Sequence, residues 1–333
     1  MPATSREVRL AVQPDGLPLP EHFAVVETPT PVPGDGEVLV RNRFFHVFPS
    51  IRTLIGGGVK DAPFPPLRPD DTLFGPAIGE VVSAPSDTDL RPGDLVHHWL
   101  GWREYAAVPA GQWTALDDSL PDPAAHLSYA EAAYTALARD ARVRPGDTVF
   151  VTGGAGGVGS FAGQFARLLG AKRVIGSTGS PDKAKRLVDE LGYDAAVLRG
   201  TRPIADQLAE AAPDGIDVLV DNVGGDQLRA AITLARPGSR FSLVGVLAGQ
   251  LSPDDTGTTA PVEIDVFQLI AKGIELRGYQ GAPDPEWATR LGGWLRSGEI
   301  VFPHVRVAGI ENAPRALHEL IGGKHFGTVV VEL

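Results

Sequence analysis

The sequence predicts an α/β protein in which a doubly wound parallel sheet accompanies a β-rich domain. From Pro145 onward, apolar strand-like runs alternate with segments of helical period, a pattern typical of parallel sheets. A glycine-rich turn joins the first of these strands to the first of these helices. Residues 6–117 show a different pattern, short β-type runs separated by Pro and Gly clusters, and helical periodicity first appears at residues 122–141.

Length and composition are those of a globular protein with two domains. A chain of 333 residues exceeds the usual size of a single domain, and 43% hydrophobic residues are enough to build a core. We expect one domain at residues 1–120 together with 299–333, and the other at residues 121–298.

Charge and cysteine usage exclude several kinds of partner and site. The net charge of −11, without any run of Lys or Arg, argues against nucleic acid and against a membrane surface as partners. The first ten residues lack the apolar stretch of a secretory signal, and no apolar segment approaches membrane-spanning length, so we expect a cytoplasmic protein. Because the chain has no cysteine, disulfides and cysteine-ligated metal sites are excluded.

The elements follow in order from these patterns. In the β-rich part we expect strands at 23–27, 37–42 and 78–82, with turns at 31–36 and 91–94. In the central part the expected strands are 148–152, 173–177, 195–198, 216–221, 240–246 and 274–279. The expected helices between them are 157–170, 181–191, 203–212, 225–235 and 262–272. This alternation fits a doubly wound sheet.

The last fifty residues are predicted to return to the β-rich part. They comprise a helix at 284–297, a strand at 301–307, a helix at 310–321 and a strand at 328–332. The final β-α-β piece has no partner in the central sheet, so we expect it to rejoin the amino-terminal domain. The segment 249–261, rich in Gly, Asp and Thr, is expected to be a mobile loop.

The turn after the first central strand satisfies the pattern G-x-G-x-x-G at Gly154, Gly156 and Gly159. The first glycine allows a tight turn, the second lets a diphosphate approach the backbone, and the third lets the helix pack closely on the strand. Backbone N–H groups at the start of the helix, including those of Gly157 and Val158, then face the phosphates. The pattern alone also fits a plain strand-to-helix turn. Between a strand and an amphipathic helix it predicts a Rossmann-type dinucleotide site.

The end of the second central strand indicates which dinucleotide binds. NAD-specific sites place an acidic side chain here, whereas this strand ends with Thr178 and Gly179 and has no carboxylate, so we place Thr178 at the cofactor. Ser180 is predicted to cap the next helix, with Lys183 in its first turn and against the helix dipole. A bound phosphate would remove that conflict; the alternative is a solvated lysine offset by Asp182. These features predict NADPH or NADP⁺ as the cofactor.

Two further segments are expected to contact the cofactor. Asn222 follows the fourth strand, where its amide can bond to ribose or carboxamide, although an Asx turn before the following glycines is an equal contender. Backbone groups of Gly245, Val246 and Leu247, at the end of the fifth strand, are expected to line the nicotinamide.

Five segments carry a resemblance to a known family: Arg91-Pro-Gly-Asp-Leu-Val96, Gly101-Trp-Arg-Glu-Tyr105, Gly163-Gln164, Asp221-Asn-Val-Gly-Gly225 and the tail at 298–332. Together they resemble the medium-chain dehydrogenase/reductase superfamily. Within it, the chain is similar to the zinc-independent branch of leukotriene B4 12-hydroxydehydrogenases, prostaglandin reductases, curcumin reductases and alkenal double-bond reductases. The resemblance implies a GroES-like catalytic domain for the β-rich part, and a homodimer formed through the last strands of the nucleotide sheet.

The resemblance also bears on zinc. In the alcohol-dehydrogenase branch a Cys and a Gly-His-Glu motif hold the catalytic metal. The corresponding stretch here is Phe74-Gly-Pro-Ala77, with Pro76 at the histidine position. We therefore expect no metal site and no chemistry through a zinc alkoxide.

Individual positions inherit roles from the resemblance. Lys183 falls at the lysine that contacts the 2′-phosphate, and Arg199 falls where a phosphate-contacting tyrosine usually lies, a task that a guanidinium could serve. His325 stands at the place of a cofactor-binding asparagine. In the segment 48–52, Ser50 replaces a tyrosine of the substrate cleft.

The implied reaction is reduction of a C=C bond next to a carbonyl, with a small apolar α,β-unsaturated ketone or aldehyde as substrate. Hydride adds at the β-carbon and the α-carbon is then protonated, so the protein must supply a donor near the carbonyl oxygen. Tyr279, which ends the sixth strand, and Ser50 are the candidate donors. Bound water or a cofactor ribose hydroxyl is the alternative to Ser50, and packing at the cleft edge is the alternative role for Tyr279. An NADPH:quinone oxidoreductase and a non-catalytic NADPH-binding relative stay open as alternatives.

Two groups of amino-terminal side chains are expected near the cleft. The first group consists of three histidines, His46, His97 and His98. A lone histidine is more often structural than a catalytic acid or base. The aromatic residues must mostly be core, although some could line an apolar substrate pocket: Phe44, Phe45, Phe48, Trp99 and Trp102.

Overall fold

The computed structural model describes residues 2–58, 64–253, 257–281 and 284–333. The chain divides into two compact units, the first made of Met1–Leu127 with His304–Leu333 and the second of Ser128–Pro303. Compactness does not test independent folding, so the expected domain boundaries at 120/121 and 298/299 stay predictions.

The second unit is built on a six-stranded sheet in which every pair of neighbouring strands is parallel. The order is β10-β9-β8-β11-β12-β13, so the chain fills one side of β8 before it crosses to the other. The fold class predicted from the sequence is confirmed. The strands are β8 (Thr148–Val151), β9 (Arg173–Thr178), β10 (Ala195–Leu198), β11 (Ile216–Asp221), β12 (Ala235–Leu243) and β13 (Glu275–Gly278).

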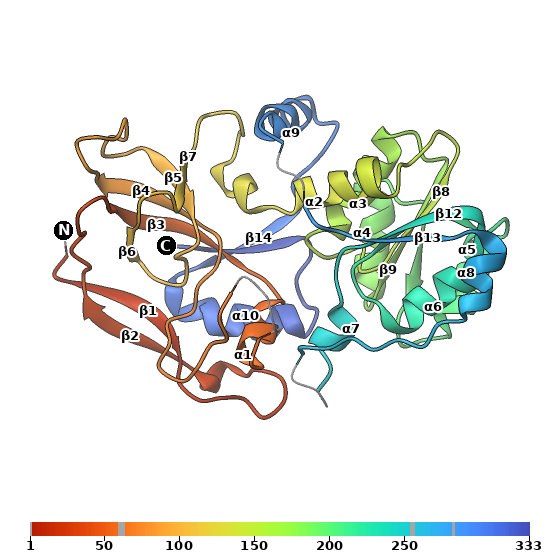
Figure 1. Cartoon of the computed structure of the whole chain (residues 1–333), viewed down its shortest axis with the longest axis horizontal. Coiled ribbons are helices and arrows are strands. Elements are labelled where there is room, and N and C mark those ends of the chain that lie inside the picture. Colours follow the sequence, from red (N-terminus) through yellow and green to blue (C-terminus); the bar gives the residue numbers. More distant parts are fainter. Residues whose placement is uncertain (1, 59–63, 254–256, 282–283) are drawn as a thin grey trace. The chain divides into compact units, whose positions relative to one another are not determined.

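Helices cover this sheet in two layers, α2 with α3 and α4, and α5 with α6 and α8 (Figure 1). Apolar side chains from the strands, among them Phe150, Leu219 and Phe241, pack beneath them with almost no exposure. The helices are α2 (Ala130–Thr135), a π-helical turn η3 (Ala136–Asp140), α3 (Gly159–Leu168), α4 (Pro181–Leu191), α5 (Ile204–Ala211), α6 (Gly225–Thr233), α7 (Leu247–Gln250), α8 (Val266–Lys272) and α9 (Trp287–Ser297).

Several expectations about this unit need revision; α8, for example, begins at Val266 rather than at residue 262. The helix after the glycine turn begins at Gly159 rather than at residue 157, because the intervening residues form the turn itself. The segment 249–261 begins inside α7 rather than as a loop. Residues 254–256 of it lie outside the described residues, and its mobility stays a prediction.

The first unit contains a larger, mainly antiparallel sheet of order β14-β15-β3-β4-β5-β7, with β6 also paired to β3. The expected return of the chain is confirmed, since the dark-blue carboxyl-terminal strands of Figure 1 join the amino-terminal sheet through β15 and β3. The strands are β3 (Val38–Val47), β4 (Ala77–Ser83), β5 (Leu95–His98), β6 (Tyr105–Val108), β7 (Trp113–Ala115), β14 (His304–Ala308) and β15 (Thr328–Glu332).

Smaller elements complete the first unit. A two-stranded sheet pairs β1 with β2 in antiparallel register. The sequence did not predict the short α1, because five residues are too few to display a helical period. These elements are β1 (Thr4–Leu10), η1 (Pro20–His22), β2 (Phe23–Pro29), α1 (Ile51–Ile55), η2 (Pro123–Leu127), η4 (Ile310–Asn312) and α10 (Ala313–Ile321).

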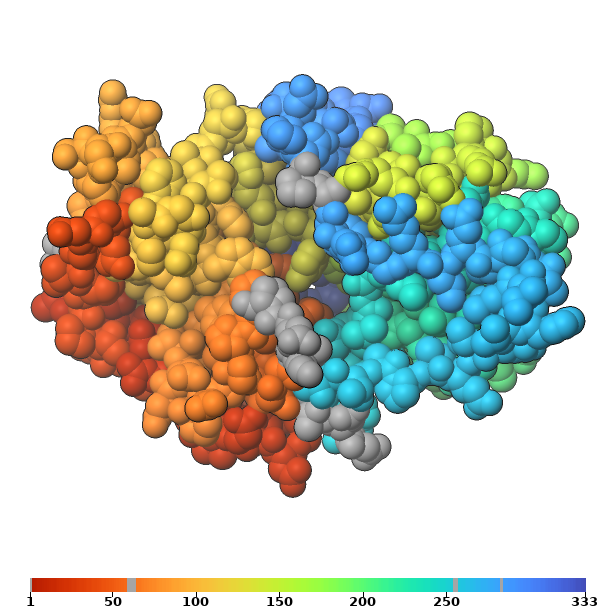
Figure 2. All heavy atoms as spheres, in the orientation of Figure 1, coloured from red at the N-terminus to blue at the C-terminus, as the bar shows by residue number. Residues whose placement is uncertain are grey.

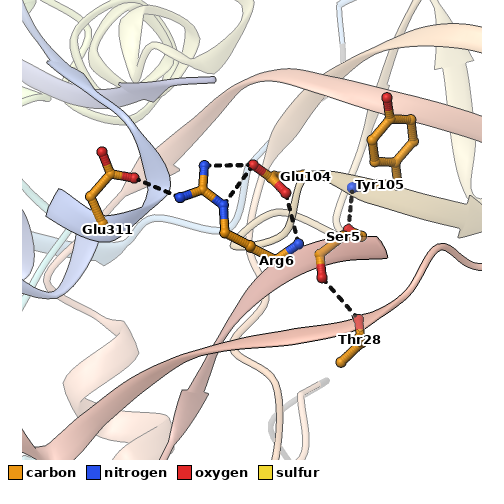
Figure 3. A network of polar contacts seen from close by, with 6 residues as sticks. All are labelled: Ser5, Arg6, Thr28, Glu104, Tyr105 and Glu311. Carbon is orange, nitrogen blue, oxygen red and sulfur yellow. Dashed lines mark hydrogen bonds and ion pairs between the residues drawn. The ribbon is translucent and has the colours of Figure 1, made fainter. Parts of the chain in front are cut away.

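Arg6 ties the first strand to the returning tail (Figure 3). Its guanidinium donates to the Glu104 carboxylate at 3.0 and 2.7 Å and to Glu311 at 3.2 Å. The neighbouring Ser5 accepts the N–H of Tyr105 at 3.3 Å. Exposed ion pairs of this kind contribute about 1 kcal/mol or less each, so the network fixes geometry more than it adds stability.

Candidate functional site

The glycine turn between β8 and α3 has the geometry of a phosphate-binding loop. The left-handed backbone conformation falls on Gly153, whose φ is +62°, so this residue makes the tight turn that the sequence pattern assigned to Gly154. The turn is held from β9, because the amide of Gly153 donates to the Ser177 hydroxyl at 2.9 Å and that of Gly154 to the Ser177 carbonyl at 2.8 Å.

The glycines of the motif are required for different reasons. A Cβ on Gly159 would lie 2.3 Å from the Gly153 carbonyl oxygen, so the helix could not approach the turn. A Cβ on Gly156 would meet, among the described residues, one atom of the protein, that same oxygen at 3.4 Å. Gly156 is thus not crowded by its own protein, and the open space above it fits a diphosphate approaching the backbone.

Thr152 and Asp221 connect the two strands at which the strand order reverses, β8 and β11. Thr152 Oγ1 donates to Asp221 Oδ1 at 2.6 Å and accepts the N–H of Asn222 at 2.7 Å. Burial raises the pKa of Asp221, and hydrogen bonds from Gly224, Thr152 and Val223 oppose that shift. Ligands of doubly wound sheets bind beside such a reversal, at the carboxyl ends of the strands.

Asn222 does not form the Asx turn that its sequence context left open. Asp221 forms it, since its Oδ1 accepts the amides of Val223 at 3.1 Å and Gly224 at 3.0 Å. The side-chain amide of Asn222 donates instead to the Thr152 carbonyl at 2.7 Å. Asn222 Oδ1 makes no hydrogen bond within the described part of the chain and is available to a ligand.

The segment after β12 lies beside this turn. The strand ends at Leu243, earlier than the expected residue 246. The amides of Gly245 and Leu247 donate to the carbonyls of Asp221 at 3.0 Å and Asn222 at 3.1 Å. Val246 is 43% exposed, and its amide has no partner among residues with described positions. Of the three backbone amides expected at a nicotinamide, that of Val246 is therefore the available one.

Two cations gather at the carboxyl end of β9, where a carboxylate is absent. Ser180 caps α4 by accepting the amide of Lys183 at 3.5 Å, as the sequence predicted, with Pro181 as the first helical residue. The Arg199 guanidinium lies against Gly179, where a Cβ would be 3.1 Å from Nη2. Burial, with Arg186 and Arg199 nearby, lowers the pKa of Lys183. Thr178 is buried, and its carbonyl accepts the amide of Arg199 at 2.8 Å.

Tyr279 directly follows β13, with its amide bonded to the Leu243 carbonyl at 2.9 Å. The side chain is half-buried. Burial raises the pKa of its hydroxyl, with Glu131 and Asp140 adding to the shift. A phenol in this setting stays protonated at neutral pH and can donate a hydrogen bond or a proton.

The two remaining site candidates belong to the first unit. Ser50 is exposed and precedes α1, where its carbonyl accepts the amide of Thr53 at 3.0 Å. His325 follows α10; its side chain is 11% exposed, and Nε2 lies 3.4 Å from the Glu319 carboxylate.

Burial separates the aromatic residues of the first unit into a core group and an exposed tryptophan, and it sets the pKa values of three histidines. Phe45 and Trp102 are fully buried with ring centroids 5.2 Å apart, and Phe44 and Phe48 are also buried, so these four belong to the core. Trp99 is 41% exposed and stacks on Phe64 at 4.7 Å. Burial lowers the pKa values of three histidines, to about 3 for His46 and His98 and about 4 for His97.

Sequence reasoning missed the residues that support the glycine turn from below. Ser177 accepts from Gly153 and donates to the buried Gln227 of α6, and Tyr193 bonds to Gly159. A polar residue near the end of an otherwise apolar strand was the available signal for Ser177.

Within the described ranges, no three His, Asp or Glu side chains lie together in a way that could hold a metal ion. Among those residues, no helix combines the length and apolar character needed to cross a membrane.

Comparison with known proteins agrees with this architecture. A family model described as the N-terminal domain of oxidoreductases matches residues 6–116, and one described as a zinc-binding dehydrogenase matches residues 157–295. The putative NADP-dependent oxidoreductase YfmJ of Bacillus subtilis is 33% identical, over 100% of this chain and 99% of that protein. The NADPH-dependent curcumin reductase of Escherichia coli is 29% identical, over 97% of this chain and 95% of that one.

Among solved structures, CurA from Vibrio vulnificus matches with a TM-score of 0.87 and 30% identity, over 98% of both chains. The same protein has been solved in complex with NADPH, with the same score, identity and coverage. Likeness over the full length at this identity covers both units. The chain therefore belongs to the medium-chain dehydrogenase/reductase superfamily, in its zinc-independent branch of curcumin and prostaglandin reductases.

Proposed function

We propose that this protein is an NADPH-dependent reductase that saturates the C=C bond of a small apolar α,β-unsaturated ketone or aldehyde. It is an oxidoreductase, and its cofactor is NADPH. Similar proteins are named for reactions on substrates of this type, including curcumin reductase and the NADP-dependent 2-alkenal reductase of Nicotiana tabacum, which is 27% identical over 90% of this chain.

The observation that carries the proposal is the grouping of cofactor-binding groups at one edge of the second unit. The glycine turn follows β8, the cation pair lies after β9 and β10, Asn222 follows β11 and Val246 follows β12. Because the strands are parallel, their carboxyl ends share an edge. Along the sheet, that edge offers first cations for a ribose phosphate, then amides for a diphosphate and then polar groups for a carboxamide, which is the order of these parts in NADPH.

Each residue has a proposed part in holding the cofactor. The diphosphate is bound by backbone N–H groups of the turn, from residues Gly154, Gly156, Gly157, Val158 and Gly159. Lys183 and Arg199, beside Thr178, bind the 2′-phosphate through charge-assisted hydrogen bonds. Asn222 Oδ1 and the Val246 amide, in the segment Gly245, Val246 and Leu247, bind the nicotinamide end. The cofactor contact expected of His325 stays a prediction from the family resemblance.

When bound, NADPH supplies the hydride that adds to the β-carbon of the substrate. The chain's own part is to bind and orient the two carbons and to donate to the carbonyl oxygen as negative charge develops there. We assign this donation to Tyr279, whose raised pKa keeps the hydroxyl protonated. Ser50 is the second candidate donor.

We also propose that two copies associate through the second unit. α8 presents three exposed apolar side chains, Val266 at 56%, Phe267 at 75% and Ile270 at 74%, and β13 is the edge strand of the sheet. The light-blue atoms of α8 form part of the surface at the right of Figure 2. An exposed apolar group beside an unpaired strand edge is expected to be covered, and a symmetric copy would cover both. The cytoplasmic location stays a prediction.

The decisive experiment follows the product as well as the cofactor. Purified protein is incubated with NADPH carrying deuterium at the transferable position and with a panel of enones, enals and simple quinones. The proposal expects a saturated carbonyl product with deuterium at the β-carbon. An allylic alcohol as product, or turnover confined to quinones, would contradict it. Binding of NADPH without any turnover would favour the non-catalytic alternative.

A further inference from the structure

Tyr193 lies directly beneath the glycine turn and has no part in the function proposed above. It follows α4, is 3% exposed, and its hydroxyl donates to the Gly159 carbonyl at 2.7 Å. The ring edge also lies against Gly163, one helical turn further along α3. The tyrosine thus holds a carbonyl at the start of the helix that follows the glycine turn and packs against the next turn of that helix.

The ring of Tyr193 occupies space that three glycines leave open. A Cβ on Gly163 would lie 2.1 Å from Cε2, and one on Gly176 would lie 2.8 Å from Cε1. A Cβ on Gly154, in the turn itself, would lie 3.4 Å from the hydroxyl oxygen. The tyrosine therefore packs at once against the turn, the helix and the strand β9.

The segment that carries Tyr193 is itself anchored. The amide of Asp194 donates to the Val174 carbonyl at 2.8 Å, and the Asp194 carboxylate accepts the Val174 amide at 2.7 Å. From the far end of α3, Arg167 pairs with Asp194 and donates to the Gly192 carbonyl at 3.0 Å. One short segment, 192–194, thus contacts both ends of α3 and is fixed to the sheet.

We propose that Tyr193 is a positioning residue for the cofactor. It holds the first turn of α3 against β9. The backbone N–H groups of the glycine turn are therefore oriented toward the diphosphate position before the cofactor binds. Preorganised donors bind more tightly because ordering them costs no free energy at the moment of binding. This inference rests on the proposed diphosphate site at the glycine turn.

The test removes the hydroxyl and keeps the ring. Tyr193→Phe is titrated with NADPH, NADH and adenosine 2′-monophosphate, which carries the ribose phosphate without the diphosphate. We expect NADPH and NADH to bind about three- to tenfold more weakly, by the same factor, because one hydrogen bond to the first turn is lost. Binding of the monophosphate should stay within about twofold of wild type. Arg167→Gln, which loosens the same segment at the other end of α3, should lower the melting temperature with little effect on NADPH.

The outcomes separate this inference from the site on which it depends. Unchanged NADPH binding by Tyr193→Phe, or equal weakening of all three ligands, would overturn the positioning role. Should Gly156→Val bind NADPH like wild type, the diphosphate site itself would be wrong. If Tyr193→Phe fails to fold, hydrogen exchange of the wild-type apoprotein decides. The amides of Gly153 and Gly154, which bond to Ser177 in the glycine turn, should already be protected without NADPH, and protection that appears only after NADPH is added would contradict the proposal.

Discussion

Thr152 donates a 2.6 Å hydrogen bond to Asp221, although the two residues are 69 positions apart in the chain. Thr152 comes directly after β8 and Asp221 ends β11, so the bond joins the two strands at which the sheet order reverses. Both side chains are buried, at 0% and 1% exposure. A buried carboxylate needs donors, and here a single hydroxyl supplies one while it also accepts the Asn222 amide.

Replacing Thr152 by valine should destabilise the protein. The shape is kept, but the Asp221 carboxylate loses a donor and the Asn222 amide loses its acceptor, which costs about 1–3 kcal/mol of the free energy of unfolding. Thr152→Ser keeps the hydroxyl and should restore most of that loss. Denaturant unfolding of both variants measures the effect. Equal stability of the valine and serine variants would show that the hydroxyl contributes nothing.

Lys183→Ala should weaken NADPH about ten- to a hundredfold and leave NADH within about twofold, because a charge-assisted hydrogen bond to the 2′-phosphate is lost. Lys185→Ala, two positions along the same helix at an exposed lysine paired with Asp189, is the matched control and should change neither ligand. Fluorescence titration with both reduced cofactors measures the four affinities. A similar loss for NADPH and NADH would refute the phosphate assignment.

Tyr279→Phe should lower the catalytic rate about a hundredfold while NADPH binding stays unchanged, if the hydroxyl donates to the developing oxyanion. Single-turnover kinetics with an enone, together with a cofactor titration, separates these effects. Ser50→Ala is the companion variant, since Ser50 is the other candidate donor. Turnover by Tyr279→Phe at the wild-type rate would remove the tyrosine from the mechanism, and a loss in Ser50→Ala instead would transfer the role.

Phe267→Glu should convert the proposed dimer to a monomer. The side chain is 75% exposed, so the substitution costs little within one copy, whereas a charge in the centre of an apolar contact is unpaired and desolvated. Sedimentation velocity at several concentrations distinguishes the two states. Val32→Glu, at a side chain of the first unit that is 88% exposed, controls for added negative charge. A wild-type protein that sediments as a monomer at all concentrations would exclude this interface.

Local chemistry made much of the fold predictable from sequence. The strands at 195–198 and 216–221 and the helix at 181–191 have the expected bounds, because apolar runs, the Ser180 cap and the glycine after Leu191 are local signals. β12 begins at residue 235 rather than at 240, since Arg-Pro-Gly-Ser in its first half reads as a turn. Its pairing with β11 shifts register between Ile216 and Val218, which only the assembled sheet reveals.

The candidate site was predictable in its parts but not in its connections. Lys183 and the glycine turn carry their own sequence patterns. The contacts of Thr152 with Asp221, and of Arg199 with Gly179, join segments that are distant in the chain, and no periodicity encodes them. The same limit explains why Gly153, rather than Gly154, makes the tight turn: the motif fixes the spacing of the glycines but not which backbone bends.

Stability should fall as pH drops below about 6.5, and His98 should account for part of the loss. The Leu100 amide donates to His98 Nδ1 at 3.1 Å, and Nε2 lies 2.9 Å from Asn42 Oδ1. Asn42 donates its own amide to the carbonyls of Leu100 and Arg103, so its oxygen faces the histidine and Nε2 must carry the proton. The neutral ring satisfies both contacts, and protonation at Nδ1 would break one of them.

The direction of this pH dependence follows from the different proton affinities of the folded and unfolded chain. Burial lowers the pKa of folded His98 to about 3, whereas the unfolded ring titrates near 6.5, so between these values the unfolded chain binds more protons and is favoured as pH falls. Each such histidine costs up to about 1.4 kcal/mol per pH unit in that window. Urea unfolding at pH 7.5, 6.5, 5.5 and 4.5 should therefore show a steeper decline for wild type than for His98→Gln, which has no group to titrate at this position. Parallel declines for the two proteins would mean that His98 is not held neutral by the fold.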